Sequence, residues 1–300
     1  MRNVVSLVGL GLLLAAGRQQ EQGRPVILLV HGRGMLGRDT ASTRQLWFNG
    51  LASTAKSLTR EPLVDERDVR VVWYADALDA RSVESCDYAP NDRRTARDRA
   101  EDPQFKQFVG TIGSVLGLLT LIVDDTSAGE DLRGLAADAS FLSDVHKRCA
   151  VESRLDRELD RARAEGRPVI LVAHSLGALV AYDLLSSRSD TGLVREFITI
   201  GSLVGSPELR HALIGGDATD TLVFPRGVGT WVNIHNVGDP FATSLPLGRD
   251  LGSTAPTDEP DPHEMLGYLR SSTAAGEILG SWCKAFSANR PPGCNDIRPN

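Results

Sequence analysis

The chain has 300 residues, of which 41% are hydrophobic and 24% charged, and its formal net charge is −6. This composition is ordinary for a soluble globular protein that buries a core, and the length suggests one large domain or one domain with an insertion. The acidic balance excludes the basic surface that nucleic-acid binding requires. No cluster of Cys and His has metal-ligand spacing, so we expect no nucleic-acid partner and no metal.

The N-terminus has the pattern of a secretory signal peptide. Met1-Arg2-Asn3 is a short basic start, residues 4–16 are apolar, and Ala15 and Gly17 are the small residues expected near a cleavage site. The run is too short for a transmembrane helix, and no cysteine follows it that could carry a lipid. We assign residues 1–24 to a signal peptide and leader, which predicts a secreted or periplasmic protein. The alternatives are a helix packed on the domain or a wrongly assigned start codon; without a signal peptide the protein would be cytoplasmic.

Apolar runs alternate with helical spacing from residue 25 onward. Residues 25–30 are continuously apolar, which is typical of a strand buried on both faces of a parallel sheet. The alternation predicts an α/β fold, with a mostly parallel sheet, right-handed crossovers and helices on both faces. The predicted strands are 25–30, 69–74, 169–173, 196–200 and 231–237, and the predicted helices among them are 43–59 and 176–187.

The segment between the second and third strands is too long for simple alternation. We treat residues 77–164 as a largely helical insertion or cap on an α/β domain spanning 25–300. Between Val109 and Val123 the chain carries no charge. This stretch could be a helix buried in the core, a mobile lid with an apolar underside, or an interfacial segment. As a lid or interfacial segment, it would make transient contact with a membrane or lipid interface.

The four cysteines are an even number, which allows two disulfides in an exported protein. Cys283 and Cys294 are close in sequence and bracket a Pro-Pro-Gly turn, whereas Cys86 and Cys149 bracket the insertion. We favour these two pairings. The alternative is four free thiols in a cytoplasmic protein.

Ser175 lies between the third strand and the helix that follows it. A sharp strand-to-helix turn with small residues two places before and after the serine is the layout of a nucleophile elbow. Gly177 keeps the second small position, and Ala173 replaces the usual glycine at the first. Ser175 is therefore the candidate nucleophile, in preference to an incidental serine in an ordinary turn.

A serine nucleophile also needs donors for the oxyanion that forms during attack. The segment His31-Gly32-Arg33-Gly34 directly follows the first strand. We expect the oxyanion to bind the backbone amides of Leu176 and of Arg33, with Gly34 as the alternative to Arg33.

The same loop, residues 32–37, formally reads G-x-G-x-x-G, which could indicate a dinucleotide site. Such a site needs an acid about 20 residues further on, at the end of the next strand. Asp39 comes too early and Asp76 too late. The sequence therefore disfavours nucleotide binding.

The candidate acid and base follow the nucleophile in the chain. Asp239 lies in a Gly-Asp-Pro turn directly after the strand 231–237, where it could also simply start the turn. Asp217 and Asp220 have no strand before them, and His263 is the histidine beyond Asp239. We interpret the remaining histidines as neighbours of the oxyanion loop and elbow (His31, His174), a packing residue in a strand (His235) and surface residues (His146, His211).

The order Ser175, Asp239, His263 is that of the α/β-hydrolase fold. The chain resembles α/β-hydrolases of the lipase/esterase kind over roughly residues 25–74 and 167–270. The resemblance is carried by Val-His-Gly-x-Gly, Ala-His-Ser-Leu-Gly-Ala-Leu-Val-Ala-Tyr, Asn-Val-Gly-Asp-Pro and His-x-x-x-x-Tyr-Leu. It departs from the family pattern at Ala173, at the arginine of the oxyanion loop and in a weak final strand before His263.

This resemblance implies hydrolysis of carboxylic esters through an acyl-enzyme on Ser175, with His263 as base, Asp239 as its orienting acid and no cofactor. The apolar stretch between Val109 and Val123 favours a lipid-like ester, although a small-molecule ester fits the same triad. Two alternatives stay open. The triad could transfer the acyl group to an alcohol or thiol, or the chain could be a non-catalytic binding protein on the hydrolase scaffold.

Overall fold

The computed structural model describes residues 23–79, 141, 144–188, 192–206 and 222–297. Within them six strands form one sheet in the order β2-β1-β3-β4-β5-β6, and every neighbouring pair is parallel. The predicted α/β class with a parallel sheet is confirmed. The strands are β1 (Val26–Val30), β2 (Val69–Val72), β3 (Val169–His174), β4 (Val194–Ile200), β5 (Val228–Asn236) and β6 (Arg249–Ser253).

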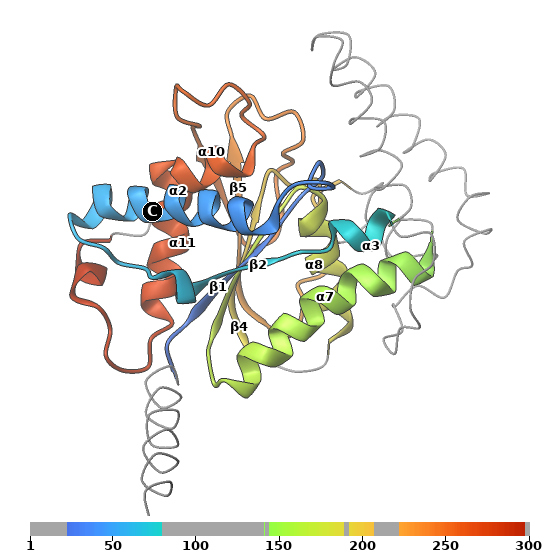
Figure 1. Cartoon of the computed structure of the whole chain (residues 1–300), viewed down its shortest axis with the longest axis horizontal. Coiled ribbons are helices and arrows are strands. Elements are labelled where there is room, and N and C mark those ends of the chain that lie inside the picture. The colour runs from blue at the N-terminus through green and yellow to red at the C-terminus, as the bar shows by residue number, and fades with distance from the viewer. Residues whose placement is uncertain (1–22, 80–140, 142–143, 189–191, 207–221, 298–300) are drawn as a thin grey trace, which may run out of the picture.

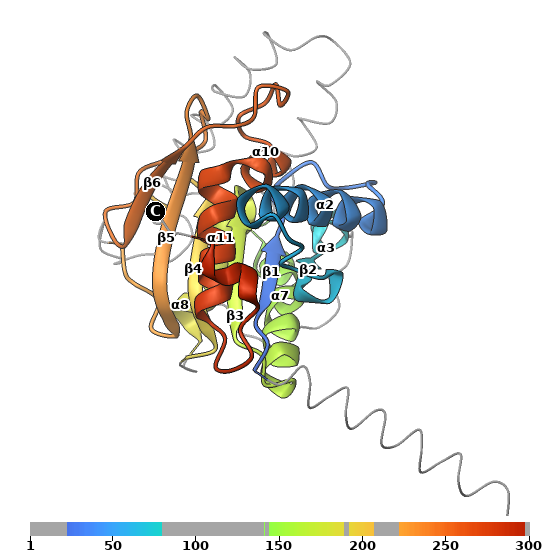
Figure 2. The same ribbon diagram turned by 90° about the vertical axis from the view of Figure 1, so that its left-hand side faces the viewer.

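Helices cover both faces of the sheet, which Figure 1 shows nearly edge-on between them. One side carries α2 (Thr40–Thr59), α10 (Met265–Arg270) and α11 (Ser272–Lys284), and the other carries α3 (Ala75–Asp79), α7 (Val145–Ala164) and α8 (Leu176–Ser187). Figure 2 shows α11 along the face of β3 and β4, both of which it contacts. Two short 3-10 turns, η1 (Glu66–Asp68) and η2 (Pro292–Asn295), complete the described elements.

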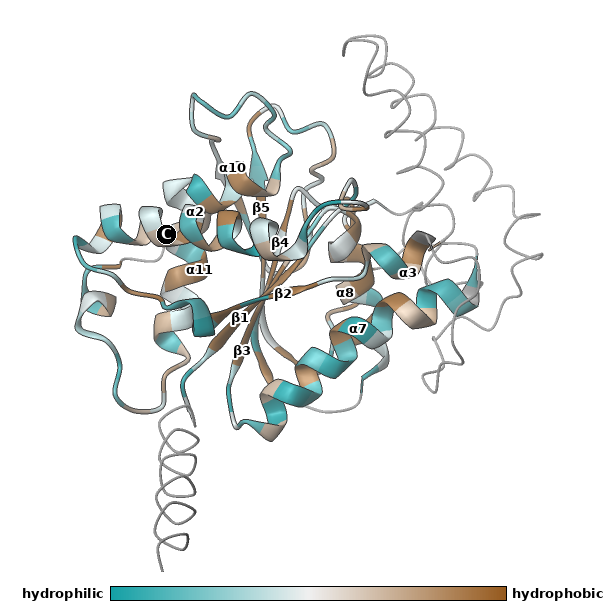
Figure 3. Ribbon diagram, viewed as in Figure 1, coloured by the Kyte–Doolittle hydropathy of each residue, from teal (hydrophilic) through white to brown (hydrophobic). Residues whose placement is uncertain are grey.

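The continuous apolar strands are buried on both faces because successive side chains point to opposite sides of the sheet. In β1, Val26, Leu28 and Val30 pack in the core under α7 and α8, whereas Ile27 and Leu29 pack under α2 and α11. All five side chains are fully buried, and the strands form the hydrophobic centre of the molecule in Figure 3. The sheet therefore separates two hydrophobic cores, one on each face.

Helix α7 lies inside the range predicted as an insertion, yet it packs on α8, β1 and β2. Its apolar residues, such as Leu155 and Leu159, are buried, and hydrophilic residues cover much of the rest of the helix in Figure 3. Residues 80–140, which include Cys86 and the stretch between Val109 and Val123, lie outside the described residues, as do residues 1–22. The limits of the signal peptide and of the insertion therefore stay predictions.

Strand β6 was not predicted from the sequence. Its side chains are mostly exposed, and it pairs with β5 at the edge of the sheet. Its sequence RDLGS holds one large apolar residue, Leu251, so it shows no apolar run or alternation that hydrophobic periodicity could detect.

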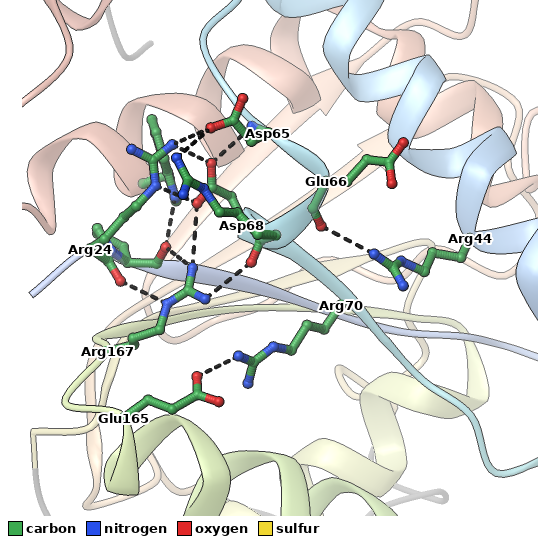
Figure 4. A network of polar contacts seen from close by, with 11 residues as sticks. Arg24, Arg44, Asp65, Glu66, Asp68, Arg70, Glu165 and Arg167 are labelled. Carbon is green, nitrogen blue, oxygen red and sulfur yellow. Dashed lines mark hydrogen bonds and ion pairs between the residues drawn. The ribbon is translucent and has the colours of Figure 1, made fainter. Parts of the chain in front are cut away.

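A network of polar contacts lies at the end of the sheet where β1 and β3 begin (Figure 4). The buried guanidinium of Arg167 donates to the backbone oxygens of Arg24, Pro25 and Arg67. It also meets the buried carboxylate of Asp68, which Arg24 binds through two nitrogens. These contacts connect the starts of β1, β2 and β3, at the end of the sheet opposite to the turn that holds Ser175.

Cys283 and Cys294 form the predicted disulfide, with 5.5 Å between their Cα atoms, and join the end of α11 to η2. Cys149 is also disulfide-bonded, whereas Cys86, its predicted partner, lies outside the described residues. Across the described ranges, no helix combines the length and apolar character that crossing a membrane requires.

Candidate active site

Ser175 occupies a strained turn between β3 and α8. Its backbone angles are φ 52° and ψ −124°, which a non-glycine residue adopts only at a cost of about 1–3 kcal/mol. Two backbone bonds fix the turn: Ser175 donates to the oxygen of Ile200, and Ala178 donates to the oxygen of Ser175. This is the geometry of a nucleophile elbow, which holds the serine hydroxyl at the end of a strand.

Gly177 allows α8 to start close to the end of β1. A Cβ atom at this position would lie 2.9 Å from the backbone oxygen of Val30 and closer still to that of His31. By contrast, Ala173 at the other small position is accommodated within the core on the α8 side of the sheet. The two small positions of the elbow are therefore unequal here, because the glycine is sterically required only after the serine.

The structure brings Ser175, His263 and Asp239 together from three separate loops. The hydroxyl oxygen of Ser175 lies 3.0 Å from Nε2 of His263, and Nδ1 of His263 lies 3.0 Å from both carboxylate oxygens of Asp239. An ionised carboxylate only accepts hydrogen bonds, so Nδ1 carries the proton and Nε2 is left to accept from the serine hydroxyl. This tautomer allows the ring to remove the serine proton.

Asp239 is held by three donors. Besides His263, the hydroxyl of Tyr268 donates to Oδ2 at 2.6 Å, and the backbone amide of Phe241 donates to Oδ1 at 2.8 Å. Burial alone would raise the pKa of this side chain, but the three hydrogen bonds favour its charged form and keep the pKa below the usual aspartate value. Asp239 is therefore ionised at neutral pH and fixed in orientation.

Gly201, directly after β4, leaves space for the contact between Asp239 and His263. Its φ is +53°, and an added Cβ would lie 2.8 Å from Oδ2 of Asp239 and 3.0 Å from Nδ1 of His263. A side chain at this position would therefore separate the carboxylate from the imidazole.

The loop after β1 lies directly against the turn that contains Ser175. A Cβ on Gly32 would lie 2.8 Å from Cβ of Ser175, so the backbone of this loop approaches the serine closely. Leu176 is the first residue of α8, and its amide belongs to the first turn, whose N–H groups have no partner within the helix. The assignment of the Arg33 and Leu176 amides to an oxyanion hole fits these positions and stays a prediction. The side chain of Arg33 itself lies over the ring of Phe241, 5.3 Å from its centroid.

Two buried histidines flank the elbow without being part of the Ser–His–Asp chain. Tyr74 donates its backbone amide to Nε2 of His31, so Nδ1 of that ring carries the proton and donates to the oxygen of Gly32. Burial lowers the pKa of His31 to about 4. Burial and the neighbouring His263 lower the pKa of His174 to about 3. Both rings are neutral at physiological pH.

Three contacts at the site were not predicted from the sequence: Tyr268 with Asp239, His174 with the backbone of His263, and Asn236 with Pro262. The sequence pattern included the Tyr268 position in the tail of the resemblance, but it assigned no role to that residue. Each contact joins side chains and backbone distant in the chain, which spacing alone cannot reveal.

Two other candidate histidines, His146 and His235, do not join the site. His146 is exposed at the start of α7, and His235 lies on β5 with its Nδ1 3.7 Å from Asp250. Asp217, Asp220 and His211 lie outside the described residues. Among the residues that the structure describes, no group of His, Cys, Asp and Glu could hold a metal ion.

Residues 153–235 match the family model of lecithin:cholesterol acyltransferase. The match covers about a quarter of the chain and runs from α7 into β5, so it includes Ser175 but neither Asp239 nor His263. Together with the parallel sheet, it supports the α/β-hydrolase superfamily and a serine enzyme that transfers acyl groups or hydrolyses esters. No curated protein matches the chain significantly.

Proposed function

We propose that this protein is a serine hydrolase that cleaves carboxylic esters, with Ser175 as nucleophile, His263 as general base and Asp239 as the acid that orients it. The observation that carries the proposal is the continuous chain of hydrogen bonds from the Ser175 hydroxyl through the His263 ring to the Asp239 carboxylate. Ser175 also lies in a strained turn that an incidental serine would not require.

In the proposed reaction, Oγ of Ser175 attacks the acyl carbonyl while Nε2 of His263 takes the hydroxyl proton. The resulting oxyanion accepts hydrogen bonds from the backbone amides of Arg33 and Leu176. When the tetrahedral intermediate collapses, the bond to the alcohol breaks and His263 returns the proton to the leaving oxygen. Asp239 stabilises the imidazolium throughout.

Water completes the cycle. His263 takes a proton from a water molecule, which attacks the acyl carbon of the acyl-enzyme. When this second tetrahedral intermediate collapses, the bond between the acyl carbon and Oγ of Ser175 breaks, His263 returns the proton to Oγ, and the acid leaves. The proposed steps use no metal or organic cofactor, because backbone amides would stabilise the substrate oxyanion and Asp239 would stabilise the imidazolium.

A second candidate is acyl transfer, in which an alcohol replaces water in the last step. The match to the lecithin:cholesterol acyltransferase family favours it. The same match supports a lipid-like ester as the substrate. Products formed from an acyl ester with and without an added long-chain alcohol would separate the two reactions, since transfer yields a new ester and hydrolysis yields only free acid.

The test of the proposed function is turnover of p-nitrophenyl esters with acyl chains of increasing length. We expect the wild-type protein to hydrolyse at least one of them, and Ser175→Ala to lower kcat by about a thousandfold or more. Ser186→Ala is the matched control, because it removes a hydroxyl from α8, the helix that directly follows Ser175. This hydroxyl donates to the backbone oxygen of Tyr182. Unchanged turnover in a folded Ser175→Ala variant would refute the assignment, and no turnover of any ester by wild type would favour a binding protein.

A further inference from the structure

The base His263 lies on a long loop. This loop runs from the end of β6 at Ser253 to the start of α10 at Met265, and no strand ladder fixes its backbone near His263. The 3.0 Å distance from the His263 ring to Ser175 nevertheless requires the loop to be held within a fraction of an ångström. Other contacts must therefore fix the position of His263.

Two side chains at the ends of sheet strands bind consecutive carbonyl oxygens of this loop. Nε2 of His174, the last residue of β3, lies 2.6 Å from the backbone oxygen of His263. Nδ2 of Asn236, the last residue of β5, donates to the backbone oxygen of Pro262 at 2.9 Å. Of the two, the His174 contact reaches the backbone of the base itself.

His174 is a donor by chemical necessity. A backbone carbonyl only accepts hydrogen bonds, so Nε2 of His174 must carry the proton of the neutral ring. The side chain is buried, and the close approach of Gly32, whose Cβ would lie 2.8 Å from Nδ1 of His174, confines the ring. The ring also contacts the His263 ring at a centroid distance of 4.7 Å. The rigid end of β3 thus holds both the backbone and the ring of the base.

We propose that His174 is a positioning residue for the base: its Nε2–H bond to the His263 backbone oxygen sets the distance between the His263 ring and Ser175. This inference rests on the proposed function of Ser175 and His263. Since Ser175 follows His174 directly in the chain, nucleophile and base are both positioned from one strand end. A displacement of about 1 Å in such an arrangement lowers rates by roughly a hundredfold.

The test compares two substitutions of His174. Phe fills a similar volume and cannot donate, whereas Gln carries an amide donor at a similar reach. His235→Phe is the matched control for loss of an imidazole, because that ring lies on β5 beside Asp250. The rate constant for labelling by a fluorophosphonate probe and the kcat and KM for an acyl ester are measured on each variant, with thermal unfolding to report folding.

We expect His174→Phe to lower the labelling rate and kcat by about 10- to 100-fold with little change in KM. His174→Gln should recover a large part of this loss, and His235→Phe should label at the wild-type rate. Wild-type labelling and kcat in a folded His174→Phe variant, or no recovery in a folded His174→Gln variant, would overturn the positioning role. Absence of labelling in the wild-type protein would refute the proposed function instead, so the two failures are distinguishable.

A measurement on the wild-type protein tests the proposal even if neither variant folds. Nitrogen-15 NMR of the histidine rings should find His174 neutral with its proton on Nε2 at neutral pH. A proton on Nδ1 would exclude the bond to the His263 carbonyl and overturn the inference.

Discussion

The Asp239 carboxylate binds Tyr268 as well as His263, and this contact has a measurable consequence. A hydrogen bond to a carboxylate favours its charged form, so Tyr268→Phe should raise the pKa of Asp239 from its lowered value. Tyr268→Phe should therefore make Asp239 titrate at a higher pH than in the wild-type protein. We also predict that kcat/KM at neutral pH falls about tenfold, because the carboxylate that orients His263 loses one of its donors.

Tyr182→Phe is the control, because its hydroxyl donates to the backbone of Val223 in another part of the molecule. Carbon-13 NMR titration of the Asp239 carboxylate, together with kcat/KM at neutral pH, makes the comparison among the three proteins. An Asp239 titration that does not move in Tyr268→Phe would contradict the role assigned to this hydroxyl.

Motif spacing and chain order sufficed to select Ser175, Asp239 and His263, which the structure brings into hydrogen-bonding distance. Ser175 has a local signature, and Asp239 follows a recognisable strand. Tyr268 and His174 could not be assigned in this way, because their partners depend on how separate loops meet. Side chains that support a site from a distance in sequence leave no local pattern.

At the scale of elements, the start of α8 against β1 depends on the absence of a side chain at Gly177. Alanine there would overlap the backbone oxygens of His31 and Val30, and overpacking of this kind costs about 1–3 kcal/mol. The overlap would also move the loop that is expected to bind the oxyanion. We therefore predict that Gly177→Ala lowers both the free energy of unfolding and the rate of acylation.

Gly276, in the middle of α11, provides the opposite case. The nearest atom to an added Cβ is Cδ1 of Leu58 at 4.0 Å, so alanine fits and gains about 0.5–1 kcal/mol from its higher helix propensity. Urea unfolding of both variants tests the pair. Equal effects of the two substitutions would contradict the packing described around the elbow.

Strands that are buried on both faces were the easiest to predict from the sequence. β1 and β3 are buried on both faces, so each is a continuous apolar run in the sequence. β6 is polar and exposed at the sheet edge, and β5 begins at Val228, earlier than the predicted residue 231, where its side chains are partly exposed. The other edge strand, β2, was predicted although it is partly exposed, because three of its four residues are valines. Hydrophobic periodicity therefore misses a strand that lacks apolar residues, as β6 does, more than one that lies at the edge.

At the scale of the whole molecule, the polar network around Arg167 is expected to contribute to the free energy of unfolding and not to the catalytic rate. The network lies where the strands begin, at the end of the sheet opposite to Ser175. The Arg167 guanidinium donates to three backbone oxygens and forms an ion pair with Asp68. Without Arg167 the Asp68 carboxylate still binds Arg24, but backbone oxygens lose a side-chain donor, which costs about 1–3 kcal/mol. We predict that Arg167→Ala loses about this much free energy of unfolding but keeps the wild-type kcat per folded molecule.

Arg67→Ala is the control, because Arg67 and its partner Asp65 are both about half exposed. Exposed pairs of this kind contribute less than about 1 kcal/mol. Urea unfolding, together with kcat normalised to the probe-labelled fraction, checks the prediction. A lowered kcat in the folded fraction of Arg167→Ala would contradict a purely structural role.

The bonding state of the cysteines indicates in which compartment the protein acts. Cys149, Cys283 and Cys294 are disulfide-bonded, and structural disulfides persist in oxidising compartments. With the N-terminal signal pattern, this supports our proposal that the protein is secreted or periplasmic. We predict that these three cysteines resist alkylation until a reductant is added and that the exported form has lost its N-terminal signal peptide by cleavage within residues 1–24. Alkylation without reductant, or recovery of the full chain from the cytoplasm, would contradict export.

The central claim is that Ser175, activated by His263 and Asp239, is a nucleophile, and mapping a covalent adduct tests it most directly. The protein is treated with a fluorophosphonate probe, digested and analysed by mass spectrometry, alongside Ser175→Ala and Ser186→Ala. The account predicts one adduct, on Ser175, that is present in Ser186→Ala and absent from Ser175→Ala. An adduct on another residue, or undiminished labelling of the folded Ser175→Ala variant, would contradict it.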